Sequence, residues 1–110
     1  MTVIWHNPRC SKSRDTLALL KRHAPDIRLY LQDPPSADDI RTVLRQLDAK
    51  PADMIRRGEK MFKELGLKDA DDAALINAMA AHPILIERPI VIHDDKAAIG
   101  RPPEDVLTLF

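Results

Sequence analysis

The feature that most constrains the fold is a strand–helix–strand pattern in the first 31 residues. Residues 2–5 are β-branched or aromatic and stop at the turn signal Asn7-Pro8. Residues 11–22 have the apolar spacing of a helix, which is expected to end before the proline that follows. Apolar and charged residues then alternate over 27–31, which predicts a second strand. Two strands joined by one helix pair in parallel through a right-handed crossover. The chain is therefore predicted to be an α/β protein.

The middle of the chain has a different pattern. Ser36, followed three residues later by Asp39, marks a helix start, and further short helical segments are predicted at 51–55, 60–65 and 71–81. Residues 36–82 are therefore expected to form a helical insertion within a single domain of residues 1–110. The positions expected in the core are Leu17, Leu20, Leu44, Leu47, Leu65 and Met79.

The β pattern returns near the C-terminus. Residues 89–92 and 97–99 are predicted strands joined by a polar turn, which indicates a hairpin, and a last helix is expected after Gly100. The element order β-α-β, helices, β-β-α predicts a mixed sheet with helices packed on it.

Composition excludes several classes of function. The 17 basic and 17 acidic residues balance, so neither nucleic acid nor a membrane surface is an expected partner. No apolar run approaches the roughly 20 residues needed to cross a bilayer. The single cysteine allows no internal disulfide and no cysteine-based zinc site, and no metal is expected. A lone thiol without a leader after Met1 favours a cytoplasmic location.

Cys10 lies where the first strand gives way to the first helix. The backbone N–H groups that open a helix favour an anion, and basic neighbours lower the pKa of a thiol. His6 and Arg14 are such neighbours, although His6 can equally be an ordinary residue at a strand end. Ser13 stands where a Cys-X-X-Cys motif would have its second thiol, so a resolving thiol must come from outside. The alternative is that Cys10 is a small buried apolar residue.

Three arginines are candidate anion ligands, because a guanidinium binds a tetrahedral oxyanion with two hydrogen bonds. These are Arg56, Arg88 and Arg101. Arg88 precedes Pro89, and such a bond can be cis. Spacing alone does not bring the three together, and for each arginine taken singly a solvated surface position is the favoured interpretation.

Residues 6–14 (His-Asn-Pro-Arg-Cys-Ser-Lys-Ser-Arg), 82–91 (His-Pro-Ile-Leu-Ile-Glu-Arg-Pro-Ile-Val) and 100–102 (Gly-Arg-Pro) resemble the ArsC-type arsenate reductases. The resemblance covers nearly the whole chain. It implies a thioredoxin-like fold with a cis Pro89. It also implies a Cys10 nucleophile that attacks arsenate held by Arg56, Arg88 and Arg101. Glutathione as co-substrate and glutaredoxin would then complete the reduction, with no bound cofactor.

Three hypotheses follow from the sequence. The first is an arsenate reductase that uses glutathione and glutaredoxin. The second is a glutathione-dependent thiol reductase of the same fold with another substrate. The third is a non-catalytic interaction or regulatory module, which predicts an ordinary pKa for the Cys10 thiol.

Overall fold

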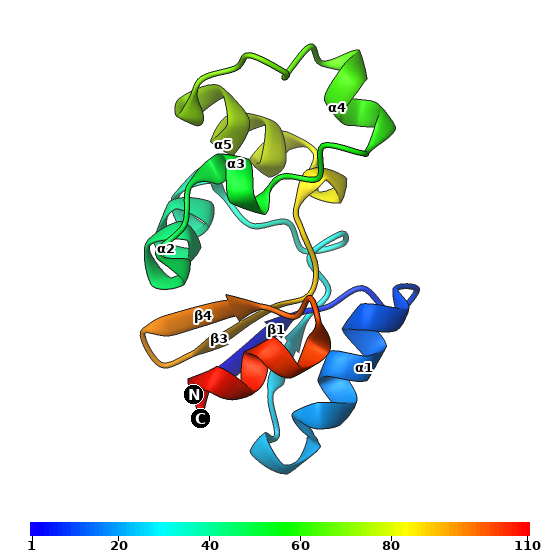
Figure 1. The fold of residues 1–110 in the computed structure, drawn as a ribbon, viewed down its shortest axis with the longest axis vertical. Coiled ribbons are helices and arrows are strands. Elements are labelled where there is room, and N and C mark those ends of the chain that lie inside the picture. The colour runs from blue at the N-terminus through cyan, green and yellow to red at the C-terminus, as the bar shows by residue number, and fades with distance from the viewer. The chain divides into compact units, whose positions relative to one another are not determined.

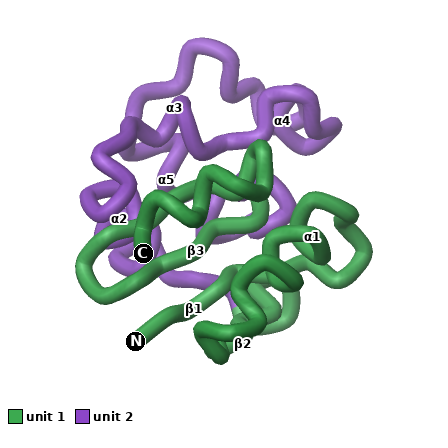
Figure 2. Tube along the Cα trace, turned by 60° about the horizontal axis from the view of Figure 1, so that its bottom comes forward, with its two compact units in different colours: residues 1–33, 88–110 green, residues 34–87 purple.

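The computed structural model describes residues 1–110, which divide into two compact units. The sheet unit comprises residues 1–33 and 88–110, and the helical unit comprises residues 34–87 (Figure 2). The chain leaves the sheet unit after Asp33 and returns at Arg88. The helical unit is thus an insertion between the second and third strands, and it contains the predicted helical segment 36–82.

The sheet unit contains four strands in the order β2-β1-β3-β4. They are β1 (Thr2–Trp5), β2 (Asp26–Arg28), β3 (Ile90–His93) and β4 (Lys96–Ile99). β1 pairs in parallel with β2 and antiparallel with β3, and β3 pairs antiparallel with β4. The βαβ unit, the hairpin and the thioredoxin-like mixed sheet predicted from the sequence are confirmed.

The second strand is shorter than the predicted 27–31. The backbone N–H groups of Gln32 and Asp33 both donate to the carbonyl of Leu29, at 3.0 and 2.8 Å. These bonds close a turn directly after β2 ends, so the alternating residues that follow Arg28 do not extend the sheet.

One long helix and two short 3-10 helices cover the sheet unit. They are α1 (Ser11–Leu19), η1 (Lys21–His23) and η3 (Pro103–Leu109), and α1 packs beside η3 (Figure 1). The first helix was predicted to continue to residue 22. Instead, the N–H of Leu20 is shared between the carbonyls of Thr16 and Leu17, and the chain tightens into η1.

The core of the sheet unit lies between its sheet and its helices. Ile4, Leu20, Val91 and Val106 are fully buried in one cluster. Ile4 and Trp5 of β1 point to opposite faces of the sheet and are both buried, which explains why apolar residues do not alternate with polar ones there. Burial of each of the four side chains in this cluster contributes roughly 1.5–3 kcal/mol to the free energy of unfolding.

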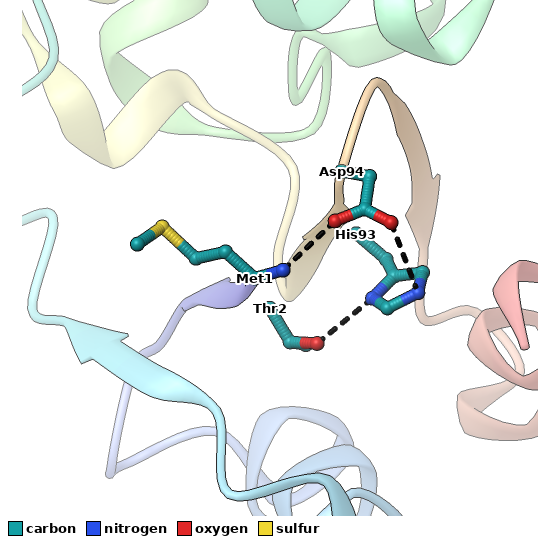
Figure 3. A network of polar contacts seen from close by, with 4 residues as sticks. All are labelled: Met1, Thr2, His93 and Asp94. Atoms are coloured by element: carbon teal, nitrogen blue, oxygen red, sulfur yellow. Dashed lines mark hydrogen bonds and ion pairs between the residues drawn. The ribbon is translucent and has the colours of Figure 1, made fainter.

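A polar network ties the start of β1 to the β3–β4 turn (Figure 3). The N-terminal ammonium of Met1 lies 2.8 Å from a carboxylate oxygen of Asp94, and the Thr2 hydroxyl lies 2.9 Å from Nδ1 of His93. The pKa of Asp94 is lowered, mainly by the hydrogen bond from the ammonium and to a lesser extent by the positive charge of the ammonium. These contacts hold the register in which Thr2 faces His93.

The helical unit consists of short helices, as predicted. They are α2 (Ala37–Leu47), α3 (Pro51–Met54), α4 (Lys60–Glu64) and α5 (Asp72–Ala81), followed by the 3-10 helix η2 (Pro83–Leu85). α5 packs against α2, α3 and η2. Ser36 and Asp39 form a reciprocal capping box at the start of α2.

The predicted core positions are partly correct. Leu20, Leu44 and Met79 are buried, and Leu17 packs against the core of the sheet unit. Leu65 was wrongly assigned to the core, since it is 41% exposed. It follows the last residue of α4, and Gly66, with φ of 64°, then turns the chain away.

No helix of the structure combines the length and the apolar character that a membrane-spanning segment requires.

We expect Ser36→Ala to lower the free energy of unfolding by about 1 kcal/mol, because the N–H of Asp39 loses its side-chain acceptor at the start of α2. Ser36→Asn, which keeps an acceptor, should retain most of the stability. Urea denaturation of both variants measures the difference. Equal stability of the two variants would contradict the capping role.

Candidate active site

Cys10 is the N-cap residue of α1 and is half-buried. Its N–H donates to the carbonyl of Asn7 at 3.0 Å, and its carbonyl accepts from the N–H of Arg14 at 3.0 Å. The first bond closes the turn after β1, and the second starts the helix. The sequence therefore places the thiol at the mouth of a helix, where backbone N–H groups face outward.

The thiol is biased toward the thiolate. Partial burial opposes ionisation of Cys10, but other interactions outweigh it and the net pKa is lowered. These interactions are hydrogen bonds from the backbone N–H groups of Ser13 and Lys12 and the positive charges of Arg88 and Arg101. The sequence predicted the direction of this shift and the role of the amides.

The source of the positive charge differs from the prediction. The basic side chains next to Cys10 in sequence do not cause the lowered pKa, whereas two distant arginines do. Arg14 instead donates from Nη1 to the carbonyl of Pro8 at 2.9 Å. Its side chain thus closes the loop 6–14.

His6 does not act as a cation beside the thiol. Burial, and secondarily the charge of Arg14, lower the pKa of His6, so its ring is neutral at neutral pH. Its Nδ1 lies 2.6 Å from the hydroxyl of the fully buried Ser13, which also accepts the N–H of Asn7 at 3.0 Å. Ser13 therefore fixes the loop to α1 in the place where a resolving cysteine would otherwise stand.

Arg101 and Arg88 reach the site from the far end of the chain. Nη2 of Arg101 donates to Sγ of Cys10 at 3.7 Å, and its Nε donates to the carbonyl of Arg88 at 2.8 Å. The Arg88–Pro89 peptide bond is cis, in agreement with the expectation, and the Arg101–Pro102 bond is also cis. The two arginines are thus tied together beside the thiol.

Gly100, which the sequence analysis did not connect with the site, allows this arrangement. A Cβ atom at position 100 would lie 2.6 Å from Oγ1 of Thr16 and 2.8 Å from Cγ of Pro89. The N–H of Gly100 donates to the carbonyl of Pro89 at 2.9 Å. Only a residue without a side chain lets the segment carrying Arg101 come this close to α1. The Gly-Arg-Pro sequence was the available signal.

Arg56 belongs to the helical unit, so its role toward Cys10 stays a prediction. Within that unit its Nη1 donates to the carbonyl of Ile84 at 3.2 Å and lies 3.1 Å from a carboxylate oxygen of Glu59. Its guanidinium is thus held in place by a neighbouring carboxylate.

No group of three or more His, Cys, Asp and Glu side chains is arranged to hold a metal ion. The donors assembled around Cys10 are instead backbone N–H groups and guanidiniums, which are groups that bind anions.

Arg101→Gln should raise the pKa of Cys10, because it removes a positive charge that stabilises the thiolate. The absorbance of the thiolate, followed against pH, reports this directly since Cys10 is the only cysteine. Arg9→Gln is the matched control, because Arg9 is exposed and does not contribute to the shift. An equal rise in both variants would show that net charge, and not the Arg101 contact, sets the pKa.

Gly100→Ala should destabilise the fold by about 1–3 kcal/mol, because the added methyl group would overlap Thr16 and Pro89. It should also raise the pKa of Cys10 by displacing Arg101. Gly58→Ala is the control, since a Cβ there has no atom within 4 Å. Thermal denaturation and the thiolate titration test the two effects, and a Gly100→Ala variant as stable as Gly58→Ala would refute the close approach.

Comparisons with known proteins agree with this geometry. Residues 5–109 match the ArsC family. An uncharacterized Escherichia coli protein, YfgD, is 49% identical and covers 96% of this chain and 93% of its own. An arsenate reductase from Haemophilus influenzae is 46% identical over 98% of this chain and 97% of its own.

A solved structure gives the same result for the fold. The arsenate reductase from Vibrio cholerae superimposes with a TM-score of 0.95 at 46% identity, covering 99% of this chain and 97% of the other. Family match, sequence identity and structural likeness all extend over nearly the full length. This chain belongs to the ArsC family.

Proposed function

We propose that this protein is an arsenate reductase in which the Cys10 thiolate is the nucleophile and glutathione and glutaredoxin supply the electrons. One observation carries the proposal: a lone thiol of lowered pKa lies at the N-terminus of α1, 3.7 Å from the guanidinium of Arg101. The relatives named arsenate reductase, at 46% identity, support arsenate as the oxyanion.

Binding precedes the chemistry. Arg88 and Arg101 present positive charge next to Cys10, and the amides at the start of α1 add N–H donors. A tetrahedral oxyanion fits such a set, because guanidiniums and N–H groups bind its oxygens while the charge is neutralised. Arg56 is proposed as a third ligand, as the family resemblance implies.

The thiolate then attacks arsenic. A sulfur–arsenic bond forms at Sγ of Cys10, and one arsenate oxygen leaves as water after protonation. The donors that bound the anion stabilise the negative charge that builds up on the remaining oxygens. His6 and Ser13 hold the loop that positions Sγ. Because His6 is neutral, the arginines and not His6 balance the negative charge of the bound oxyanion.

External thiols complete the reduction. The glutathione thiol forms a second sulfur–arsenic bond, and a further arsenate oxygen leaves as water. The two sulfurs bound to arsenic, from Cys10 and from glutathione, then join as a mixed disulfide, so that arsenic gains two electrons and leaves as arsenite. Glutaredoxin reduces this disulfide and returns Cys10 to the free thiol. An external thiol is required because the chain has one cysteine and Ser13 occupies the resolving position.

The lowered pKa of Cys10 speaks against a non-catalytic module, which would leave the thiol at its ordinary value. No feature of the site favours a different substrate for a glutathione-dependent reductase over arsenate.

Cys10→Ser should reduce arsenate-dependent oxidation of glutathione to background, because the serine hydroxyl stays protonated at neutral pH. The same variant should still bind arsenate, since Arg88 and Arg101 are intact. A coupled assay with glutaredoxin measures the first effect, and titration calorimetry measures the second. Turnover that survives in Cys10→Ser, or a wild-type protein that has an ionised thiol but no turnover, would refute the proposal.

A further inference from the structure

A pocket of about 480 Å³ opens between α1 and η3. This volume is in the range of about 300–1,000 Å³ that is usual for small-molecule sites. Its lining includes Lys12, Asp15 and Leu19 from α1, and Pro102, Pro103 and Glu104 from the start of η3.

Both segments that line the pocket also carry a residue of the site around the reacting sulfur. Lys12 is two residues from Cys10 on α1. Pro102 directly follows Arg101, whose Nη2 lies 3.7 Å from Sγ of Cys10. A molecule that occupies this pocket therefore lies one or two residues along the chain from Arg101 and Cys10, the two residues that meet at the sulfur.

The pocket carries charges of both signs. Lys12, Asp15 and Glu104 line this pocket together, and all three residues are exposed. No ion pair engages any of the three. A fitting ligand is therefore zwitterionic, with a carboxylate for Lys12 and an ammonium for the two acids.

The neighbouring pocket of the sheet unit has a different character. It measures about 570 Å³, lies on the β2 side of α1, and is lined by His6, Arg14, Lys21 and apolar side chains, without any carboxylate. That lining offers nothing to an ammonium group. Of the two pockets, only the one between α1 and η3 matches a zwitterion.

We propose that this pocket, the α1–η3 pocket, binds the γ-glutamyl end of glutathione. This inference rests on the proposed function, in which glutathione acts at Cys10. The γ-glutamyl end bears an ammonium and a carboxylate on one carbon, which suits Glu104 and Asp15 on one side and Lys12 on the other. The cysteinyl sulfur is in the middle of the tripeptide, so the anchored end leaves the sulfur free to reach Cys10.

A reaction without arsenate isolates this binding. The Cys10 thiolate attacks one sulfur of glutathione disulfide, the sulfur–sulfur bond breaks, and glutathione leaves as a thiolate. The product is a mixed disulfide between Cys10 and glutathione. Mass spectrometry follows its formation as the gain of one glutathionyl group. The rate of the same reaction with the neutral bis(2-hydroxyethyl) disulfide serves as the reference.

The test compares Lys12→Gln and Glu104→Gln with Lys21→Gln, a matched change in η1, which follows α1, at a residue that lines the other pocket. The quantity compared is the ratio of the rate with glutathione disulfide to the rate with the neutral disulfide. Lys12→Gln and Glu104→Gln should each lower this ratio by about fivefold. Lys21→Gln should leave this ratio unchanged. The ratio cancels any effect of a substitution on the reactivity of Cys10 itself.

Glu104→Gln is the decisive variant. Glutathione disulfide is an anion, so a purely long-range charge effect would make removal of a carboxylate accelerate the reaction. Recognition of the ammonium predicts the opposite, a slower reaction. An increased or unchanged ratio in Glu104→Gln, or a Lys21→Gln ratio reduced as much as that of Lys12→Gln, would overturn the inference.

The outcome is separable from that of the proposed function. A wild-type protein that shows the expected ratios but does not turn over arsenate would refute arsenate reduction and support the pocket. Arsenate turnover with ratios insensitive to Lys12 and Glu104 would support the enzyme and refute the pocket.

Discussion

The site depends on one close approach between segments distant in sequence. Gly100 packs against Thr16 of α1 and against Pro89, at distances that leave no room for a side chain. This contact brings Arg101 to Cys10, Arg101 also donates to the backbone carbonyl of Arg88, and the positive charge of Arg88 acts on the same thiol. Two cations and the amides of one helix therefore meet at a single sulfur. Their combined effect exceeds the burial that opposes ionisation.

Local patterns predicted the parts of the fold that local forces determine. The first strand, the start of α1 and the capping box of Ser36 follow from residue type and spacing alone, and all are present. Element ends were less predictable, because they depend on competing hydrogen bonds. The carbonyl of Leu29 ends the second strand by accepting two N–H groups, which no propensity indicates.

The same division applies to the site. The position of Cys10 at the mouth of a helix is a local property and could be predicted. The meeting of Cys10 with Arg101, 91 residues away, is a tertiary contact that only the family resemblance suggested. His6 shows most clearly what the sequence cannot predict. A histidine near a thiol is a candidate cation, but burial lowers the pKa of His6, and the neutral ring lies within hydrogen-bond distance of the hydroxyl of Ser13.

The central claim is that an anion-binding site of backbone N–H groups and arginines lowers the pKa of the Cys10 thiol. The rate of Cys10 alkylation by iodoacetamide against pH, with and without arsenate, tests it most directly. We predict a midpoint below the ordinary value of about 8.5 for a free cysteine, and slower alkylation when arsenate occupies the site. A midpoint at or above that value, unaffected by arsenate, would contradict it.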